Sequence, residues 1–471
     1  MLLWGILGYL GLTLAVGFLA ARRVKSSTDF ALAGRNLSFF MASSTVFATW
    51  FGSETILGSS AEFAKHGFSG VVEEPFGAAL CLILVGLFFA RRLYRMRLNN
   101  LGEFYRHQFG VPTEIIASVI MAFSYLSWVA AQFLALGIVL NTISGLNLQL
   151  CIVLMAVLVT LYTTMGGMWA VSMTDAIQMT VIIIGLVVVF FVVASDFGGV
   201  SAVVQMPPPA HWNFLPEAKS ASVIGFMSAL MILGIGSIPG QDVFQRVMAA
   251  KNERIAVFSS IFSGILYFTV ALIPLFLGFL ALKTLGKNDA PADMQFLIPK
   301  LVLLRTNVVI QIVFFGALLS AILSTASGAL LAPSVVLSEN LLGPLFKPND
   351  EKLLRISRIS TVVLAAVSLV MALHYTKITE LVSDSSAYGL VALFVPLVAG
   401  MYFKSTNAVA AIASILGGTL VWKLWPEEKT LLTPQLAGFI AALAPYAVLA
   451  PFTLVRRFYG KIQPAKNPTG E

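Results

Sequence analysis

Apolar residues dominate the chain in long runs, and short polar stretches separate them. A helix that spans a membrane needs about 20 consecutive, mostly apolar residues. Thirteen runs meet this criterion, over residues 2–21, 38–60, 70–90, 113–142, 147–165, 173–195, 221–245, 255–282, 308–338, 357–374, 380–402, 407–424 and 433–455. The pattern predicts an all-α polytopic membrane protein in which residues 1–471 form a single transmembrane domain.

Composition supports this fold class. A typical soluble domain is about 25% charged, whereas 11% of these residues are charged, 58% are hydrophobic and the mean hydropathy is +0.89. Water cannot solvate so apolar a surface, which excludes soluble enzymes, disordered tails and nucleic-acid-binding domains. Most of the 30 Lys and Arg residues fall in alternate connections, where basic residues mark the cytoplasmic side. We therefore expect an outside N-terminus, a cytoplasmic C-terminus, a lipid-bilayer environment such as a bacterial inner membrane, and no nucleic-acid partner.

Two of the predicted spans are interrupted. Residues 48–58 carry Glu54 and small polar residues in mid-span, and residues 234–242 contain three glycines and Pro239. Interrupted helices at corresponding positions of two halves indicate an inverted-repeat transporter and mark its binding site, because unwound backbone is tolerated at membrane depth only where it lines a cavity or is buried in protein. The alternative is that Gly and Pro only kink two packed helices.

A set of oxygen donors lies in the ninth predicted span. Ala321, Ser324 and Thr325 stand at i, i+3 and i+4, so a carbonyl and two hydroxyls share one helix face. Such oxygens suit a hard monovalent cation, although small residues also serve helix packing in membranes. Asp175 begins another span, where it either belongs to an ion site or stabilises the helix N-terminus.

Glu54 lies deep in its span without a basic neighbour in sequence, which favours a role in a site. Trp50 and Trp128 lie within spans and either stack on a ligand cation or pack in the core. The four histidines are scattered, and the sequence contains no nucleophile elbow or phosphate-binding loop. These features predict a transporter that is not an enzyme.

Three segments resemble the sodium/solute symporter family, which carries proline, sugars, choline and similar solutes: residues 29–37, residues 162–167 followed by Thr174 and Asp175, and residues 241–251. The resemblance implies a LeuT-like core of two inverted five-helix repeats. These repeats would cover residues 38–195 and 221–402, with one peripheral helix at 2–21 and two at 407–455. This arrangement also contains thirteen helices.

The family's main sodium site implies sodium as the coupling ion here. Its oxygen donors would come from a broken helix and from the ninth span, at Ala48, Phe51, Ala321, Ser324 and Thr325. Asp175, Ser324 and Ser327 match a second sodium set found in some members, although Gly328 lacks a hydroxyl often present there.

Residues 47–50, 86–90, 237–239 and 404–407 resemble the high-affinity choline transporter subgroup, whose ligand sits in an aromatic cage. Trp50 and Trp128 match two cage positions, whereas Ala78 and Gly240 are not aromatic. The expected solute-binding residues are Trp50, Glu54, Thr55, Trp128, Gly240 and Gln241. We expect import of an amine, quaternary ammonium compound or amino acid by alternating access. Two alternatives remain open: a proton-coupled carrier of the same fold that uses Asp175 or Glu54, and a solute-sensing membrane domain with an appended signalling domain.

Overall fold

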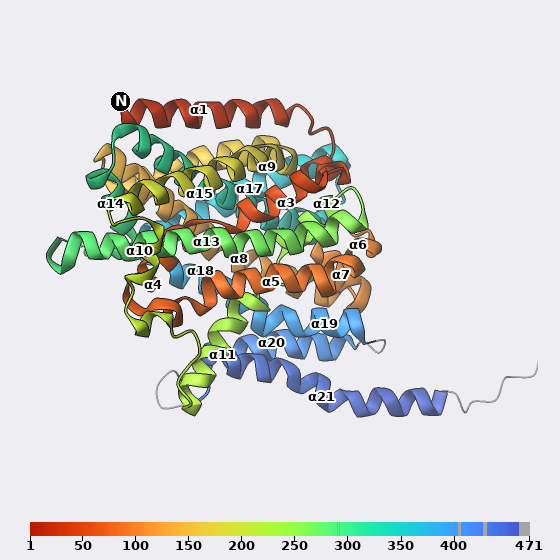
Figure 1. Ribbon diagram of the computed structural model, residues 1–471. Helices are drawn as coiled ribbons and strands as arrows, with labels where there is room; N and C mark the ends of the chain where they lie inside the picture. Colours follow the sequence, from red (N-terminus) through yellow and green to blue (C-terminus); the bar gives the residue numbers. More distant parts are fainter. Residues whose placement is uncertain (290, 292, 404–406, 427–430, 461–471) are drawn as a thin grey trace, which may run out of the picture.

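A computed structural model describes residues 1–289, 291, 293–403, 407–426 and 431–460 (Figure 1). Residues 404–406 of the choline-transporter-like segment lie outside this part. Within it the regular elements are helices: α1 (Leu2–Ala21), α2 (Ser27–Leu32), α3 (Phe39–Trp50), α4 (Ser59–His66), α5 (Ala78–Leu84), α6 (Ala90–Met96), α7 (Leu101–Phe109), α8 (Val111–Ser144), α9 (Leu148–Ser195), α10 (Val200–Gln205), α11 (Ser220–Gly234), α12 (Gln241–Ala249), α13 (Glu253–Asp289), α14 (Leu297–Arg305), α15 (Val308–Val336), α16 (Gly343–Phe346), α17 (Asp350–His374), α18 (Ile378–Tyr388), α19 (Phe394–Tyr402), α20 (Ala408–Leu424) and α21 (Pro434–Gly460).

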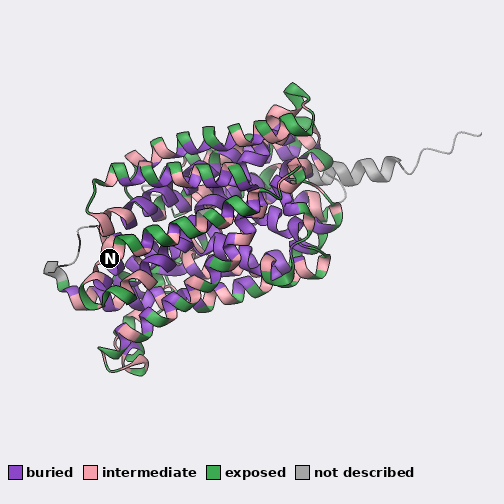
Figure 2. Cartoon of the chain, turned by 90° about the horizontal axis from the view of Figure 1, so that it is seen from above, coloured by how far each residue is buried: buried purple, intermediate pink, exposed green. Residues whose placement is uncertain are grey.

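The long helices run side by side in one bundle (Figure 1), and buried residues fill its centre while exposed residues line the outer helices (Figure 2). Eight helical stretches in the described part are long and apolar enough to cross a membrane, and three shorter apolar helices cover other predicted spans. Large apolar side chains such as Phe123, Leu161 and Phe191 are exposed on the outer faces. Lipid chains would cover these side chains in a membrane. The fold is thus the predicted all-helical membrane bundle, and the total of thirteen spans stays a prediction.

The structure differs from the expected element boundaries in one place, because the connection expected between residues 283 and 307 contains α14 and the end of α13. The spans expected at 147–165 and 173–195 share the label α9, which has non-helical backbone angles at Gly167, between the two spans. Tyr162 Oη lies within hydrogen-bonding distance of Thr174 Oγ1, twelve residues away, which a straight helix would place about 18 Å distant. The chain therefore doubles back at Gly167, whose φ of 49° requires glycine.

Both predicted interruptions are present. The helix α3 ends at Trp50, and Phe51 has non-helical angles of φ −83° and ψ 74°. Gly52 N donates to Trp50 O instead of to Ala48 O, so Ala48 O loses its usual helical partner. The second interruption covers residues 235–240, between α11 and α12. A Cβ atom on Gly389 would lie 1.9 Å from Gly236 O, so glycine allows α18 to end directly against this break.

A short backbone bridge joins the start of α3 to the end of α12. Leu37 N donates to Ala249 O over 3.0 Å, and Lys251 N donates to Leu37 O over 2.9 Å. The segment that precedes α3 is thereby joined to the segment that follows α12. The ends of α3 and α12 that lie opposite the breaks are therefore held next to each other.

Candidate ion and solute site

The broken end of α3 meets α15 through Thr325. Thr325 Oγ1 lies 3.3 Å from Ala48 O and 3.1 Å from Ala321 O. A Cβ atom on Gly52 would lie 2.7 Å from Thr325 Oγ1, so the residue that follows Phe51 also abuts this hydroxyl. The structure therefore brings the oxygens of Ala48, Ala321 and Thr325 together, with Phe51 in the adjoining break. A carbonyl freed by helix unwinding beside a hydroxyl suits a cation such as sodium.

Asp175 of α9 lies beside this set and is fully buried. Ser324 Oγ donates to Asp175 Oδ1 over 2.5 Å, and Thr45 Oγ1 of α3 donates to Asp175 Oδ2. Ser327 Oγ instead donates to the main-chain oxygen of Ser324 over 3.0 Å. The two predicted sodium sets therefore meet at Ser324, while the Ser327 hydroxyl is bonded within its own helix.

A buried arginine, which sequence reasoning did not place in the site, packs against the same helices. Arg246 of α12 is 1% exposed. Its guanidinium donates to Thr45 O (3.1 Å), Asp242 O (2.8 Å) and Thr49 Oγ1 (2.5 Å). A Cβ atom on Gly328 would lie 2.5 Å from Arg246 Nη2. The absence of a side chain at Gly328 therefore leaves the space that the Arg246 guanidinium group occupies.

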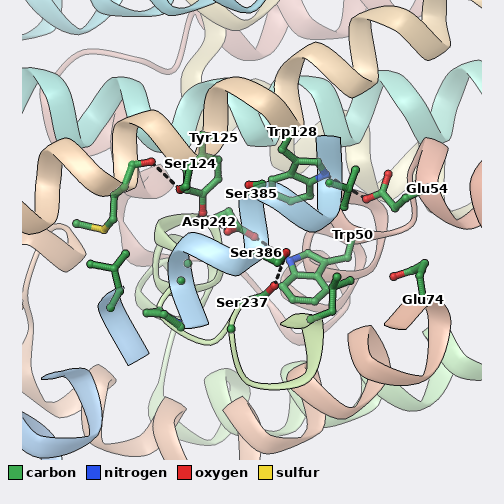
Figure 3. Close-up of a pocket in the computed structure, with 18 residues that line it drawn as sticks. Trp50, Glu54, Glu74, Ser124, Tyr125, Trp128, Ser237, Asp242, Ser385 and Ser386 are labelled. Atoms are coloured by element: carbon green, nitrogen blue, oxygen red, sulfur yellow. Dashed lines mark hydrogen bonds between the residues drawn. The ribbon is translucent and has the colours of Figure 1, made fainter. Parts of the chain in front are cut away.

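A cavity lies next to the two helix breaks (Figure 3). Three aromatic side chains line it, those of Trp50, Tyr125 and Trp128, together with the carboxylates of Glu54, Glu74 and Asp242. Among the described lining residues none is Lys or Arg. The remaining lining residues are small or apolar, and they include Ser237, Gly240, Ser385 and Ser386.

Each tryptophan is oriented by a buried carboxylate. Trp50 Nε1 donates to Asp242 Oδ2 over 2.8 Å, and Tyr125 Oη donates to Asp242 Oδ1. Trp128 Nε1 donates to Glu54 Oε1 over 3.1 Å, and Gln132 Nε2 donates to Glu54 Oε2 over 3.0 Å. Hydrogen bonds of this kind fix the indole planes. They also place carboxylate oxygens at the cavity wall, where a positively charged ligand group would be stabilised.

The expected solute-binding residues do not all reach the cavity. Thr55 does not line the cavity, and its Oγ1 donates to Glu74 Oε1 over 2.9 Å. Gln241 is turned away, and its Oε1 accepts a hydrogen bond of 2.7 Å from Leu101 N. Trp50, Glu54, Trp128 and Gly240 do line the cavity, whereas Ala78 is not among the lining residues.

Broken helices around a central cavity, with a cation-type oxygen set beside it, define a secondary membrane transporter. The sodium:solute symporter family matches residues 30–418, and the chain belongs to this family. It is therefore a sodium-coupled symporter of a small solute, which confirms the family, fold class and coupling ion predicted from the sequence.

Individual relatives are similar over most of their length. The high affinity choline transporter 1 of Homo sapiens is 26% identical over 86% of this chain and 73% of its own. The sodium/pantothenate symporter of Escherichia coli strain K12 is 25% identical over 88% of both chains. The solved structure of a substrate-bound, outward-open Na⁺-coupled sialic acid symporter superposes with a TM-score of 0.82 at 21% identity, covering 96% of this chain and 98% of the other. That structure establishes the shared fold.

Proposed function

We propose that this symporter imports a small organic solute that carries a positive amine or quaternary ammonium group. The observation that carries the proposal is the pairing of each cavity tryptophan with a buried carboxylate, Trp50 with Asp242 and Trp128 with Glu54. An indole face attracts a desolvated cation by about 2 kcal/mol, and a neighbouring carboxylate adds to that attraction. Quaternary ammonium compounds, amines and zwitterionic amino acids all carry such a cation.

A second cavity supports the same class of solute. It adjoins the first, with which it shares Glu54 and Glu74, and it is further lined by Glu62, Glu73 and Glu380. Glu380 also pairs with Lys377 over 2.5 Å. A cleft lined by one sign of charge concentrates ions of the opposite sign. A second cavity with several acids would therefore favour cationic and zwitterionic solutes over simple anions.

We further propose that sodium binds Ala48, Phe51, Ala321, Ser324 and Thr325, with Asp175 alongside. Sodium at this position would hold α3 against α15 and thereby stabilise the conformation that accepts the solute. In this scheme residues 38–195 and 221–402 form two inverted repeats that alternate access around the site, while 2–21 and 407–455 are peripheral. We also propose that the protein lies in a cell membrane, such as a bacterial inner membrane.

The proposal is tested by binding of choline, betaine, proline and a neutral sugar to the purified protein, with sodium or with potassium. We expect sodium-dependent binding of a cationic or zwitterionic compound, which Trp50→Ala weakens at least about tenfold, since truncating a cation–π partner removes roughly 2 kcal/mol. Strongest binding of the sugar, or an effect of Trp50→Ala below about twofold, would show that the aromatic residues only pack. Val129→Ala, a change next to Trp128 at a side chain outside the cavity lining, serves as a control for packing defects.

A further inference from the structure

A cleft that shares no lining residue with the solute cavity combines two arginines with an apolar wall. Its lining residues come from three helices: Phe18, Ala21 and Arg22 at the end of α1, Thr164 and Met165 of α9, and Arg358 of α17. The helix α1 packs against α9, and α17 packs against α9 as well, so α9 forms the floor between them. None of these residues belongs to the sodium or solute site.

The two arginines lack anionic partners within the protein. In the part of the chain that the structure describes, neither Arg22 nor Arg358 forms an ion pair. Arg358 Nε and Thr164 Oγ1 are buried atoms without a hydrogen-bond partner. A buried polar atom that lacks a partner costs free energy, and a nearby guanidinium adds positive charge. The neighbouring Arg23 is engaged differently, because its guanidinium lies over the Trp169 ring at 5.2 Å from the ring centroid.

The position of the cleft agrees with the membrane boundary. Arg22 directly follows the apolar helix α1, so it lies where the hydrocarbon region ends and headgroups begin. Phe18 and Met165 are 44% and 43% exposed on the outward side of the same cleft. The predicted outside N-terminus puts the end of α1 on the cytoplasmic side, and the same end of the bundle carries α6 and α7, which contain Arg91, Arg95 and Arg106 (Figure 1). Basic pockets between membrane helices on that side bind anionic lipid headgroups.

We propose that this cleft binds one anionic phospholipid. The phosphate would lie between the Arg22 and Arg358 guanidinium groups, with the Thr164 hydroxyl as a further donor. An acyl chain would run along Phe18 and Met165. The charge and the apolar wall together select a lipid over a free anion, since a soluble phosphate would use only the polar half of the cleft.

The test is native mass spectrometry of the full-length protein with phosphatidylglycerol or phosphatidylcholine. We expect wild type to retain phosphatidylglycerol preferentially. The double variant Arg22→Gln/Arg358→Gln should lower its retention by roughly 30-fold, because each basic residue near an anionic lipid contributes about 1 kcal/mol. Arg355→Gln, which removes an exposed charge one turn earlier on α17, should retain the lipid like wild type.

Three results would overturn the proposal. The first is equal retention of the two lipids by wild type. The second is wild-type retention of phosphatidylglycerol by the double variant. The third is displacement of phosphatidylglycerol by inorganic phosphate at equal concentration, which would indicate a small-anion site. Retained sodium-dependent thermal stabilisation shows that the double variant is folded, so loss of lipid cannot be attributed to misfolding.

Discussion

Ser324 Oγ donates a hydrogen bond of 2.5 Å to Asp175 Oδ1, and this contact joins α15 to α9 in the interior of the bundle. Thr45 of α3 bonds the other oxygen of the same carboxylate. The carboxylate thus touches both helices that would surround the ion. Asp175 does not line the solute cavity, so a change in Asp175 should affect sodium binding more than solute binding.

Asp175→Asn should weaken sodium activation while it leaves solute selectivity unchanged. Removing one negative charge beside the ion should cost about 1–3 kcal/mol, which corresponds to about 5- to 150-fold in sodium affinity. The measurement is a sodium titration of thermal stability for the variant and for wild type. Asp196→Asn, at the end of the same helix α9, is the control. Unchanged sodium affinity in Asp175→Asn would assign this acid to structural hydrogen bonding alone.

Gly328→Ser should destabilise the protein, although it adds the hydroxyl that the predicted second sodium set lacks at this position. The new Cβ would lie 2.5 Å from Arg246 Nη2 and 2.8 Å from Thr49 Cγ2. Overpacking of this kind costs about 1–3 kcal/mol. Thermal unfolding should show a lower midpoint for Gly328→Ser. Gly316→Ala on the same helix has no atom within 4 Å of its new methyl group and should not lower the midpoint. Equal midpoints for the two variants would contradict the close packing of Arg246.

Asp242→Asn should weaken the binding of a cationic solute more than it weakens the binding of sodium. The carboxylate fixes Trp50 and Tyr125 and lines the cavity. Loss of a buried charge that faces a cation should lower solute affinity by about tenfold or more. Equilibrium binding of the best compound from the four-compound screen measures this effect. Asp293→Asn, in a connection outside the cavity, controls for a general loss of charge. If both variants bind the solute equally, Asp242 does not contact its positive group.

Much of the architecture could be predicted because apolar runs and helix breakers are local signals. The first span has the predicted bounds of Leu2–Ala21, and both interruptions fall where Gly, Pro and polar residues disturb an apolar run. Tyr125 was missed, yet it stands three residues before Trp128 and therefore shares its helix face. Gln241 was expected in the cavity because it adjoins the break. Neighbouring helical residues point about 100° apart, however, and only Asp242 faces inward.

Arg246 could not be identified as part of the site from sequence alone. It follows an apolar span, so it resembles the basic residues that mark cytoplasmic connections. Its partners Thr45 and Thr49 lie about 200 residues away along the chain, and its packing depends on the missing side chain of Gly328. Contacts of this type depend on tertiary structure, which no local pattern encodes.

The central claim is that sodium binds between the broken helix α3 and α15, and thermal stability in sodium against potassium tests it without a known solute. Ligand binding to the native state raises stability in proportion to the logarithm of ligand concentration above the dissociation constant. At constant ionic strength, we predict that sodium raises the unfolding midpoint of wild type and potassium does not. Ser324→Ala/Thr325→Ala should remain folded and lose this sodium-specific rise. An equal rise with both ions, or a sodium-specific rise that persists in the double variant, would contradict the account.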